Sequence, residues 1–148
     1  MARISLVGKN DRKIYHIAKG LYRTIISGKE TAGSYAVIEM VVPPGGGPGP
    51  HAHPDIEEVF YVAVGEVDFY TEDGMQQAKA GDTIRIPTGG AVHAFKNTSE
   101  SDATLICTVF PAGLDDMFAE INASDPSAVK EIGEKYGNQF FPADFFGR

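Results

Sequence analysis

The sequence contains no tryptophan and a single cysteine, Cys107. One cysteine cannot form a disulfide within the chain, so a secreted scaffold held together by disulfides is excluded. Positive charge is also scarce, because 13 Lys and Arg residues face 20 Asp and Glu residues and the formal net charge is −7. A net-acidic surface repels phosphate groups, and no run of Lys or Arg offsets it. We therefore expect neither nucleic acid nor a membrane surface as a partner.

Long apolar segments are absent too. No window approaches the ~20 apolar residues that a membrane-spanning helix requires. The first ten residues hold no sustained apolar run followed by a small-residue cleavage site, so we expect a cytoplasmic protein. A chain of 148 residues with 43% apolar and 22% charged residues is typical of a globular protein with one core. One domain spanning residues 1–148 is predicted.

Most of this domain has the composition of a β-structure. Residues 14–110 are rich in Val, Ile, Thr, Tyr and Phe and are interrupted by Gly or Pro at short intervals. This pattern is typical of short strands joined by tight turns, as in an antiparallel sandwich or barrel, here over about residues 14–111. Seven strands are predicted: Leu21–Ser27, Tyr35–Val42, Glu58–Val64, Val67–Thr71, Asp82–Ile86, Ala91–Lys96 and Thr104–Phe110.

The pattern changes in residues 112–148, for which we predict a helical tail. Leu114–Ile121 has the pattern of a short helix, and a second helix is expected to begin with Asp125 as N-cap and Pro at its first position. The second helix is expected to end at Gly137 and to pack a stripe of three apolar residues on the β domain: Val129, Ile132 and Tyr136. The aromatic end of the tail is expected to dock on the barrel or on a neighbouring subunit.

Three of the four histidines lie in two short blocks. The first block reads Gly45-x5-His51-x-His53-x4-Glu58-x6-Gly65, and the second reads Gly81-x5-Pro87-x-Gly89-x3-His93-x3-Asn97. On an extended chain His51 and His53 project from the same face, so their imidazoles can bind one ion. Glu58 adds a carboxylate oxygen, and His93 would come from a distant strand. The predicted metal ligands are therefore His51, His53, Glu58 and His93.

Imidazole and carboxylate together suit a divalent transition metal, and Fe, Mn, Ni, Cu, Co and Zn all remain candidates. The absence of a thiolate ligand argues against a structural zinc site. Four protein ligands on an ion that prefers five or six leave positions for water, dioxygen or a substrate. The site is therefore expected to be reactive.

The two blocks resemble those of the cupin superfamily, whose small proteins are jelly-roll (double-stranded β-helix) barrels. The resemblance covers about residues 35–111, and the segment after Pro111 is similar to the tail of small bacterial quercetinase-like cupins. It implies an all-β fold with C-terminal helices and a metal site of three His and one Glu. One departure exists, because three residues separate Gly89 from His93 where the family usually has two. The loop that carries His93 is therefore expected to shift slightly.

The neighbouring Glu57 also follows the histidines, but only Glu58 has the family's spacing from Gly65. Glu57 is expected at the solvated rim. Alternation from Glu58 places its strand neighbours Phe60, Val62 and Val64 inward. The same alternation in the other strands places Arg85 outside. It places four further side chains inward: Phe69, Phe95, Ile84 and Ile86. The barrel interior is thus predicted to be apolar and aromatic, which suits a planar or hydrophobic ligand unless the rings simply fill the barrel.

The resemblance further implies a dioxygenase acting on a small enol, catechol or flavonol-like substrate, with Glu58 as the catalytic residue that takes up the substrate proton. Two alternatives stay open: a metal-dependent isomerase, and a non-enzymatic module that binds a small molecule or a metal. Cupins of this size usually form homodimers, so a homodimer is expected. Cys107 is predicted to be buried and His16 exposed, and alternation does not settle whether Glu39 faces the pocket.

Overall fold

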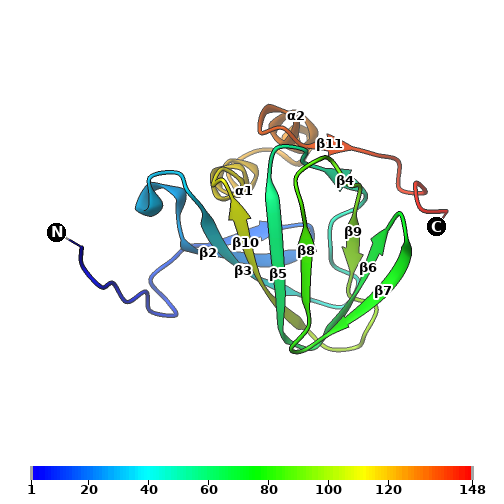
Figure 1. The fold of residues 1–148 in the computed structure, drawn as a ribbon, viewed down its shortest axis with the longest axis horizontal. Helices are drawn as coiled ribbons and strands as arrows, with labels where there is room; N and C mark the ends of the chain where they lie inside the picture. The colour runs from blue at the N-terminus through cyan, green and yellow to red at the C-terminus, as the bar shows by residue number, and fades with distance from the viewer. Residues whose placement is uncertain (1, 148) are drawn as a thin grey trace.

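The computed structural model describes residues 2–147, and its strands form three antiparallel sheets (Figure 1). The largest sheet has the order β1-β2-β3-β10-β5-β8. Its strands are β1 (Ile14–Ile17), β2 (Gly20–Ile26), β3 (Ala36–Val42), β10 (Ala103–Phe110), β5 (Glu57–Val64) and β8 (Thr83–Ile86). A three-stranded sheet has the order β7-β6-β9, with β7 (Gly74–Lys79), β6 (Glu66–Thr71) and β9 (Ala94–Lys96). The third sheet pairs β4 (His51–Ala52) with β11 (Gln139–Phe140).

Strand alternation builds the core. In β3 every second side chain from Ala36 to Val42 is buried, and β10 alternates in the same way. Cys107 on β10 lies opposite Ile38 on β3 and opposite Phe60 on β5, so these three side chains belong to one inner face. The prediction that Cys107 is buried is confirmed, since its exposed fraction is 0%.

Two strand-level expectations need correction. Val64 was expected to point inward but is 56% exposed. The pairing of β10 with β5 runs from Thr104 opposite Val64 to Leu105 opposite Val62, so Ala63 is skipped and the alternation breaks there. Ile84 is half-buried and packs against the core, and Ile86 belongs to the core, so both inward predictions for this strand are confirmed. The seven predicted strands also leave out β1, β4, β7 and β11, and β7 is mostly exposed and carries no apolar alternation.

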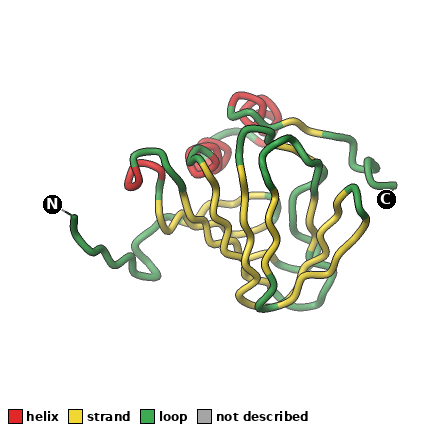
Figure 2. The backbone as a smooth tube through the Cα atoms, in the orientation of Figure 1, coloured by secondary structure: helices red, strands yellow, loops and turns green. Residues whose placement is uncertain are grey.

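The C-terminal helices cover one end of the barrel (Figure 2). Helix α1 (Leu114–Asn122) contacts β1 and β3, and the Phe118 ring meets the buried Tyr22 ring edge-on at 5.1 Å. Asp125 caps as predicted by accepting a hydrogen bond from Ser127 N–H, but it starts a 3-10 turn, η2 (Pro126–Ala128), that precedes α2 (Val129–Lys135).

The expected apolar stripe is therefore only partly buried. Ile132 is 8% exposed and Tyr136 packs against the core, but Val129 is 36% exposed because it lies at the junction of the two short helices. Within residues 2–147 no helix is long and apolar enough to cross a membrane. The observed strands and helices confirm the predicted all-β class with C-terminal helices.

Candidate metal centre

The glycine-rich loop before β4 is held against the end of β9. Gly45 N–H donates to the carbonyl oxygen of Asn97 at 2.7 Å, and Asn97 N–H donates to the carbonyl oxygen of Gly46 at 2.9 Å. Gly47 has a φ of +127°, and a Cβ there would overlap the carbonyl oxygen of Phe95. Only glycine permits this close approach, which carries the chain from β3 to the first histidine.

His51 and His93 are joined directly through their backbones. His51 N–H donates to the carbonyl oxygen of His93 at 3.0 Å, and the reverse bond is 2.9 Å long. The extra residue in the second block is accommodated before this bridge, where Gly89 N–H donates to the carbonyl oxygen of Pro54 at 2.8 Å and Gly90 adopts a φ of +86°. His93 therefore reaches the first block despite the unusual spacing.

The three histidines converge, because one ring nitrogen from each of His51, His53 and His93 lies within 4.8 Å of the other two. His51 is half-buried, whereas His53 and His93 are buried. His51 Nδ1 lies 2.8 Å from the carbonyl oxygen of Gly49, and His93 Nδ1 lies 2.9 Å from that of Ala91. A carbonyl oxygen only accepts, so each Nδ1 carries the proton and each Nε2 keeps its lone pair for a ligand.

Glu58 joins this group from β5 and is 3% exposed. Its Oε1 lies 3.0 Å from His53 Nε2 and 3.5 Å from His93 Nε2. Its Oε2 accepts a hydrogen bond from the Cys107 thiol at 3.1 Å. The structure thus brings together all four predicted ligand residues, which come from β4, β5 and the segments beside β4 and β9.

Ionisation at the site favours a neutral His51 and an ionised Glu58, whereas His53 holds a proton more readily than a free imidazole. Burial, and then the neighbouring His93, lower the pKa of His51 to about 4. Burial would also lower the pKa of His53, but hydrogen bonding to the Glu58 carboxylate outweighs it and the pKa is raised. Burial opposes ionisation of Glu58, yet the hydrogen bond from His53 and the nearby His93 imidazole hold the pKa of Glu58 well below the ordinary value.

The residues present fit a divalent transition metal. His53 Nδ1 and His93 Nε2 are buried without a hydrogen-bond partner among the described residues. Buried polar atoms are normally paired, and a cation would satisfy the His93 nitrogen at the point where the histidines and Glu58 converge. Nitrogen and carboxylate donors also match the borderline-soft first-row ions. That His51, His53, His93 and Glu58 ligate one ion stays a prediction.

The other acidic and histidine candidates lie outside this centre. Glu57 is at the rim, as predicted, in an exposed ion pair with Arg85 at 3.0 Å. Glu39 is on the outward face of β3 and pairs with Arg23 at 3.1 Å, so it does not enter the site. His16 is exposed on β1, as expected.

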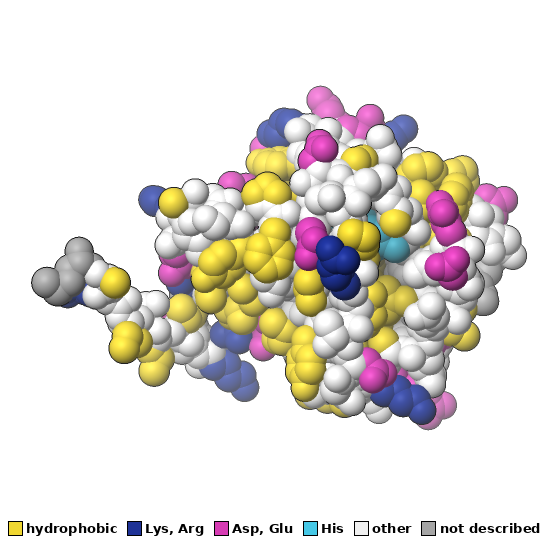
Figure 3. Space-filling view, in the orientation of Figure 1, with side chains coloured by type: hydrophobic (Ala, Val, Ile, Leu, Met, Phe, Trp, Pro, Cys, Tyr) yellow, Lys and Arg dark blue, Asp and Glu magenta, His cyan; other side chains and the backbone are white. Residues whose placement is uncertain are grey.

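Three phenylalanine rings occupy the barrel interior next to the histidines. Phe60, Phe69 and Phe95 are each at most 2% exposed, and their ring centroids are 5.2 to 5.6 Å apart. Phe60 and Phe95 follow Glu58 and His93 by two residues, so they form the next layer of the same inner face. These rings therefore pack the barrel, and the half-buried His51 marks the accessible side of the centre. Figure 3 shows histidine surface in a recess beside hydrophobic side chains.

The sequence reading missed how the tail supports the site. Phe140 on β11 lies opposite His51 on β4, and Phe141 N–H donates to the carbonyl oxygen of Pro50 at 3.1 Å. A Cβ on Gly133 of α2 would overlap the Phe140 ring. Helix α2 therefore presses β11 onto the strand that carries His51.

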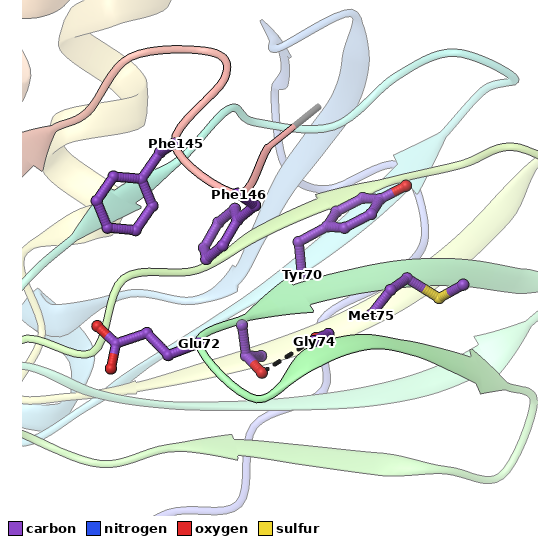
Figure 4. Close-up of a pocket in the computed structure, with 7 residues that line it drawn as sticks. Tyr70, Glu72, Gly74, Met75, Phe145 and Phe146 are labelled. Atoms are coloured by element: carbon purple, nitrogen blue, oxygen red, sulfur yellow. Dashed lines mark hydrogen bonds between the residues drawn. The ribbon is translucent and has the colours of Figure 1, made fainter.

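Beyond β11 the tail crosses the β6–β7 hairpin, where it closes a surface cavity of about 360 Å³ (Figure 4). Its lining is mixed: Phe145 and Phe146 come from the tail, and the hairpin contributes Tyr70, Met75 and the polar side chains of Thr71 and Glu72. The Phe145 ring also contacts the rings of Phe141 and Phe146, both at a centroid distance of 5.0 Å. The aromatic tail thus docks on the barrel of its own chain.

Residues 38–109, which contain all four predicted ligands, match the family model described as the cupin domain. The chain belongs to the cupin superfamily. Solved cupin barrels share its fold, so the predicted jelly-roll class is confirmed. No curated protein matches the chain.

Three solved structures illustrate the likeness. A predicted oxalate decarboxylase from Thermotoga maritima is 21% identical, with a TM-score of 0.65 over 72% of this chain and 99% of that one. The polyketide cyclase RemF from Streptomyces resistomycificus is 24% identical, with a TM-score of 0.64 over 75% of this cupin and 81% of RemF. KdgF from Halomonas sp. is 16% identical, with a TM-score of 0.66 over 76% and 99% of the two chains. At these identities the comparisons establish the fold, and this cupin has a three-histidine group that could hold a divalent metal.

Proposed function

We propose that this cupin is a metal-dependent dioxygenase acting on a small substrate with an enol, catechol or flavonol-type hydroxyl. The observation that carries the proposal is the convergence of three imidazoles within 4.8 Å beside a buried carboxylate. Two of these imidazoles are fixed in the tautomer that a metal ligand needs. Four protein ligands would leave open positions for the substrate oxygen and for dioxygen.

Each residue has a definite task in this proposal. His51, His53, His93 and Glu58 would hold the ion, which would supply Lewis acidity and lower the pKa of the bound substrate hydroxyl. Glu58 would also take up the hydroxyl proton on its carboxylate, which is buried beside the histidines. His53 Nε2 lies 3.0 Å from Glu58 Oε1, so the two predicted ligands stand next to each other at the centre.

The packing of the barrel restricts how a substrate would bind. The rings of Phe60, Phe69 and Phe95 fill the interior behind the histidines. A substrate would therefore approach from the side of His51, which is half-buried while His53 and His93 are buried. This arrangement suits a ligand that presents one oxygen-bearing edge and leaves its remainder outside the barrel.

Metal analysis and oxygen uptake test the proposal. The protein purified with its metal, or reconstituted with each first-row ion, would be assayed with catechols, flavonols and enols in an oxygen electrode. We expect one dioxygen consumed per substrate, with both labelled atoms recovered in the product from ¹⁸O₂. Glu58→Gln should abolish turnover, and Glu57→Gln serves as the matched control because Glu57 lies at the rim. Equal substrate consumption without oxygen would overturn the dioxygenase assignment.

A second candidate is a metal-dependent isomerase or cyclase that uses no oxygen. It is favoured by two structural neighbours, the polyketide cyclase RemF and a sugar phosphate isomerase from Silicibacter pomeroyi with a TM-score of 0.55. In this case the metal would polarise a carbonyl and Glu58 would move a proton between substrate atoms. Metal-dependent turnover under argon would support it, and failure to bind any metal would instead favour a metal-free binding module.

We also propose that the protein works as a cytoplasmic homodimer with a small molecule as its only other partner. Apolar side chains are exposed on the outward face of β5, where Tyr61 is 47% and Val64 is 56% exposed. Burial of these side chains against a second copy would remove them from water. Light scattering should give twice the chain mass, and Tyr61→Glu should shift the protein to the monomer.

A further inference from the structure

The buried thiol of Cys107 contacts the candidate metal centre without belonging to the predicted ligand set. Cys107 is 0% exposed on β10, and its Sγ lies 3.1 Å from Glu58 Oε2. An ionised carboxylate has no hydrogen to give, so the thiol is the donor. The two residues are 49 positions apart in the sequence, and the pairing of β10 with β5 brings them together.

This contact makes the two oxygens of Glu58 unequal. Oε2 accepts the thiol hydrogen, while Oε1 lies 3.0 Å from His53 Nε2 and 3.5 Å from His93 Nε2. The last torsion of a glutamate is broad, so an unanchored carboxylate rotates readily and can offer either oxygen or both. Around the thiol, the cross-strand neighbours Ile38 and Phe60 are buried apolar side chains.

We propose that Cys107 is a positioning residue whose thiol holds Glu58 Oε2, so that Oε1 alone is presented to a metal bound by the three histidines. The inference rests on the metal site of the proposed function. A thiol is a weak hydrogen-bond donor, so it orients the carboxylate without withdrawing much of its charge. Groups that orient metal ligands typically change metal affinity 10- to 100-fold when they are removed.

Three substitutions separate the hydrogen bond from the packing. Cys107→Ser keeps a donor of similar size, Cys107→Val fills the space without a donor, and Cys107→Ala removes the donor without adding bulk. Ile38→Val is the matched control, because Ile38 is equally buried opposite Cys107 and does not contact Glu58 through a hydrogen bond. The readouts are the Co(II) dissociation constant from calorimetry and the visible d–d spectrum of the Co(II) protein, which reports the ligand geometry.

We expect Cys107→Ser to retain the wild-type spectrum and an affinity within about threefold of wild type. Cys107→Val and Cys107→Ala should each weaken Co(II) binding about 10-fold or more and change the d–d bands. The thermal midpoint of each metal-free variant shows whether it is folded. If Cys107→Val is unfolded, the comparison of folded Cys107→Ala with Cys107→Ser tests the inference.

The outcomes distinguish this inference from the proposed function. If the wild-type protein binds no Co(II), the metal site itself is wrong. If wild type binds Co(II) and the valine and alanine variants match it in affinity and spectrum, the metal site stands and the positioning role is refuted. Loss of binding in Cys107→Ser equal to that in Cys107→Val also refutes it, because packing and not the donor would then control the site.

Discussion

Asn97 closes the second histidine block and makes a network whose removal should have a large, measurable effect. Its side chain is completely buried, and its Nδ2 donates to the carbonyl oxygens of Val42 at 2.8 Å and Ser101 at 2.7 Å. Its Oδ1 accepts from Ser99 N–H at 2.9 Å and from the Ser99 hydroxyl at 2.7 Å. One amide therefore joins the end of β3 to the turn between β9 and β10.

Asn97→Ala removes all four hydrogen bonds. The bonds to Ser99 are partly exposed and can be replaced by water, but the carbonyl of Val42 is left buried without its partner. An unsatisfied buried group costs about 1–3 kcal/mol and each further lost bond about 1 kcal/mol. We expect the free energy of unfolding to fall by about 3 kcal/mol, which corresponds to a drop in Tm of about 6–12 °C for a domain of this size.

Asn97→Asp separates the loss of hydrogen bonds from the loss of side-chain packing. Aspartate has nearly the same shape, but at neutral pH it presents an oxygen where Nδ2 faced the carbonyls of Val42 and Ser101. If hydrogen bonding stabilises the turn, Asn97→Asp should be at least as destabilised as Asn97→Ala. Calorimetry and urea unfolding of the metal-free protein measure both, with the exposed Lys96→Ala as control. An Asn97→Asp protein melting within about 2 °C of wild type would refute the reasoning.

Four further predictions concern the metal centre and its support. His51→Ala should abolish stoichiometric metal retention in mass-spectrometric metal analysis after dialysis, whereas His16→Ala should retain wild-type content because His16 is exposed outside the site. Gly133→Ala should displace the Phe140 ring, so the free energy of unfolding should fall by about 1–3 kcal/mol and metal binding in calorimetry should weaken. Unchanged stability and affinity would contradict the support that β11 gives to the strand carrying His51. Metal at 100 times its Kd should stabilise the protein by about 2.7 kcal/mol in thermal melts, and an unchanged Tm would count against a folded-state site. The fully buried Cys107 should react with a thiol reagent only on unfolding, so rapid labelling in buffer would contradict its burial.

Local patterns determined much of this protein from the sequence alone. Side chains alternate along an extended chain wherever it lies, so the shared face of His51 and His53 and the inward position of Phe60 follow from spacing. The choice of Glu58 over Glu57 came from the spacing to Gly65 that the family resemblance implies. Capping chemistry is equally local, and Asp125 begins its helical segment as expected. The two blocks also carried the family resemblance, and the fold that it implied is the fold observed.

The tertiary structure alone decided the features that depend on register between distant strands. The skipped residue Ala63, which turns Val64 outward, exists only in the pairing of β5 with β10. The same pairing sets the Cys107 thiol against Glu58, although each residue by itself is consistent with an ordinary buried position. Strand β11 is only two residues long. It forms because it pairs with β4 and because helix α2 packs against its Phe140 ring. Alternation tells which face a side chain takes, but the partner on that face is set by how remote strands align.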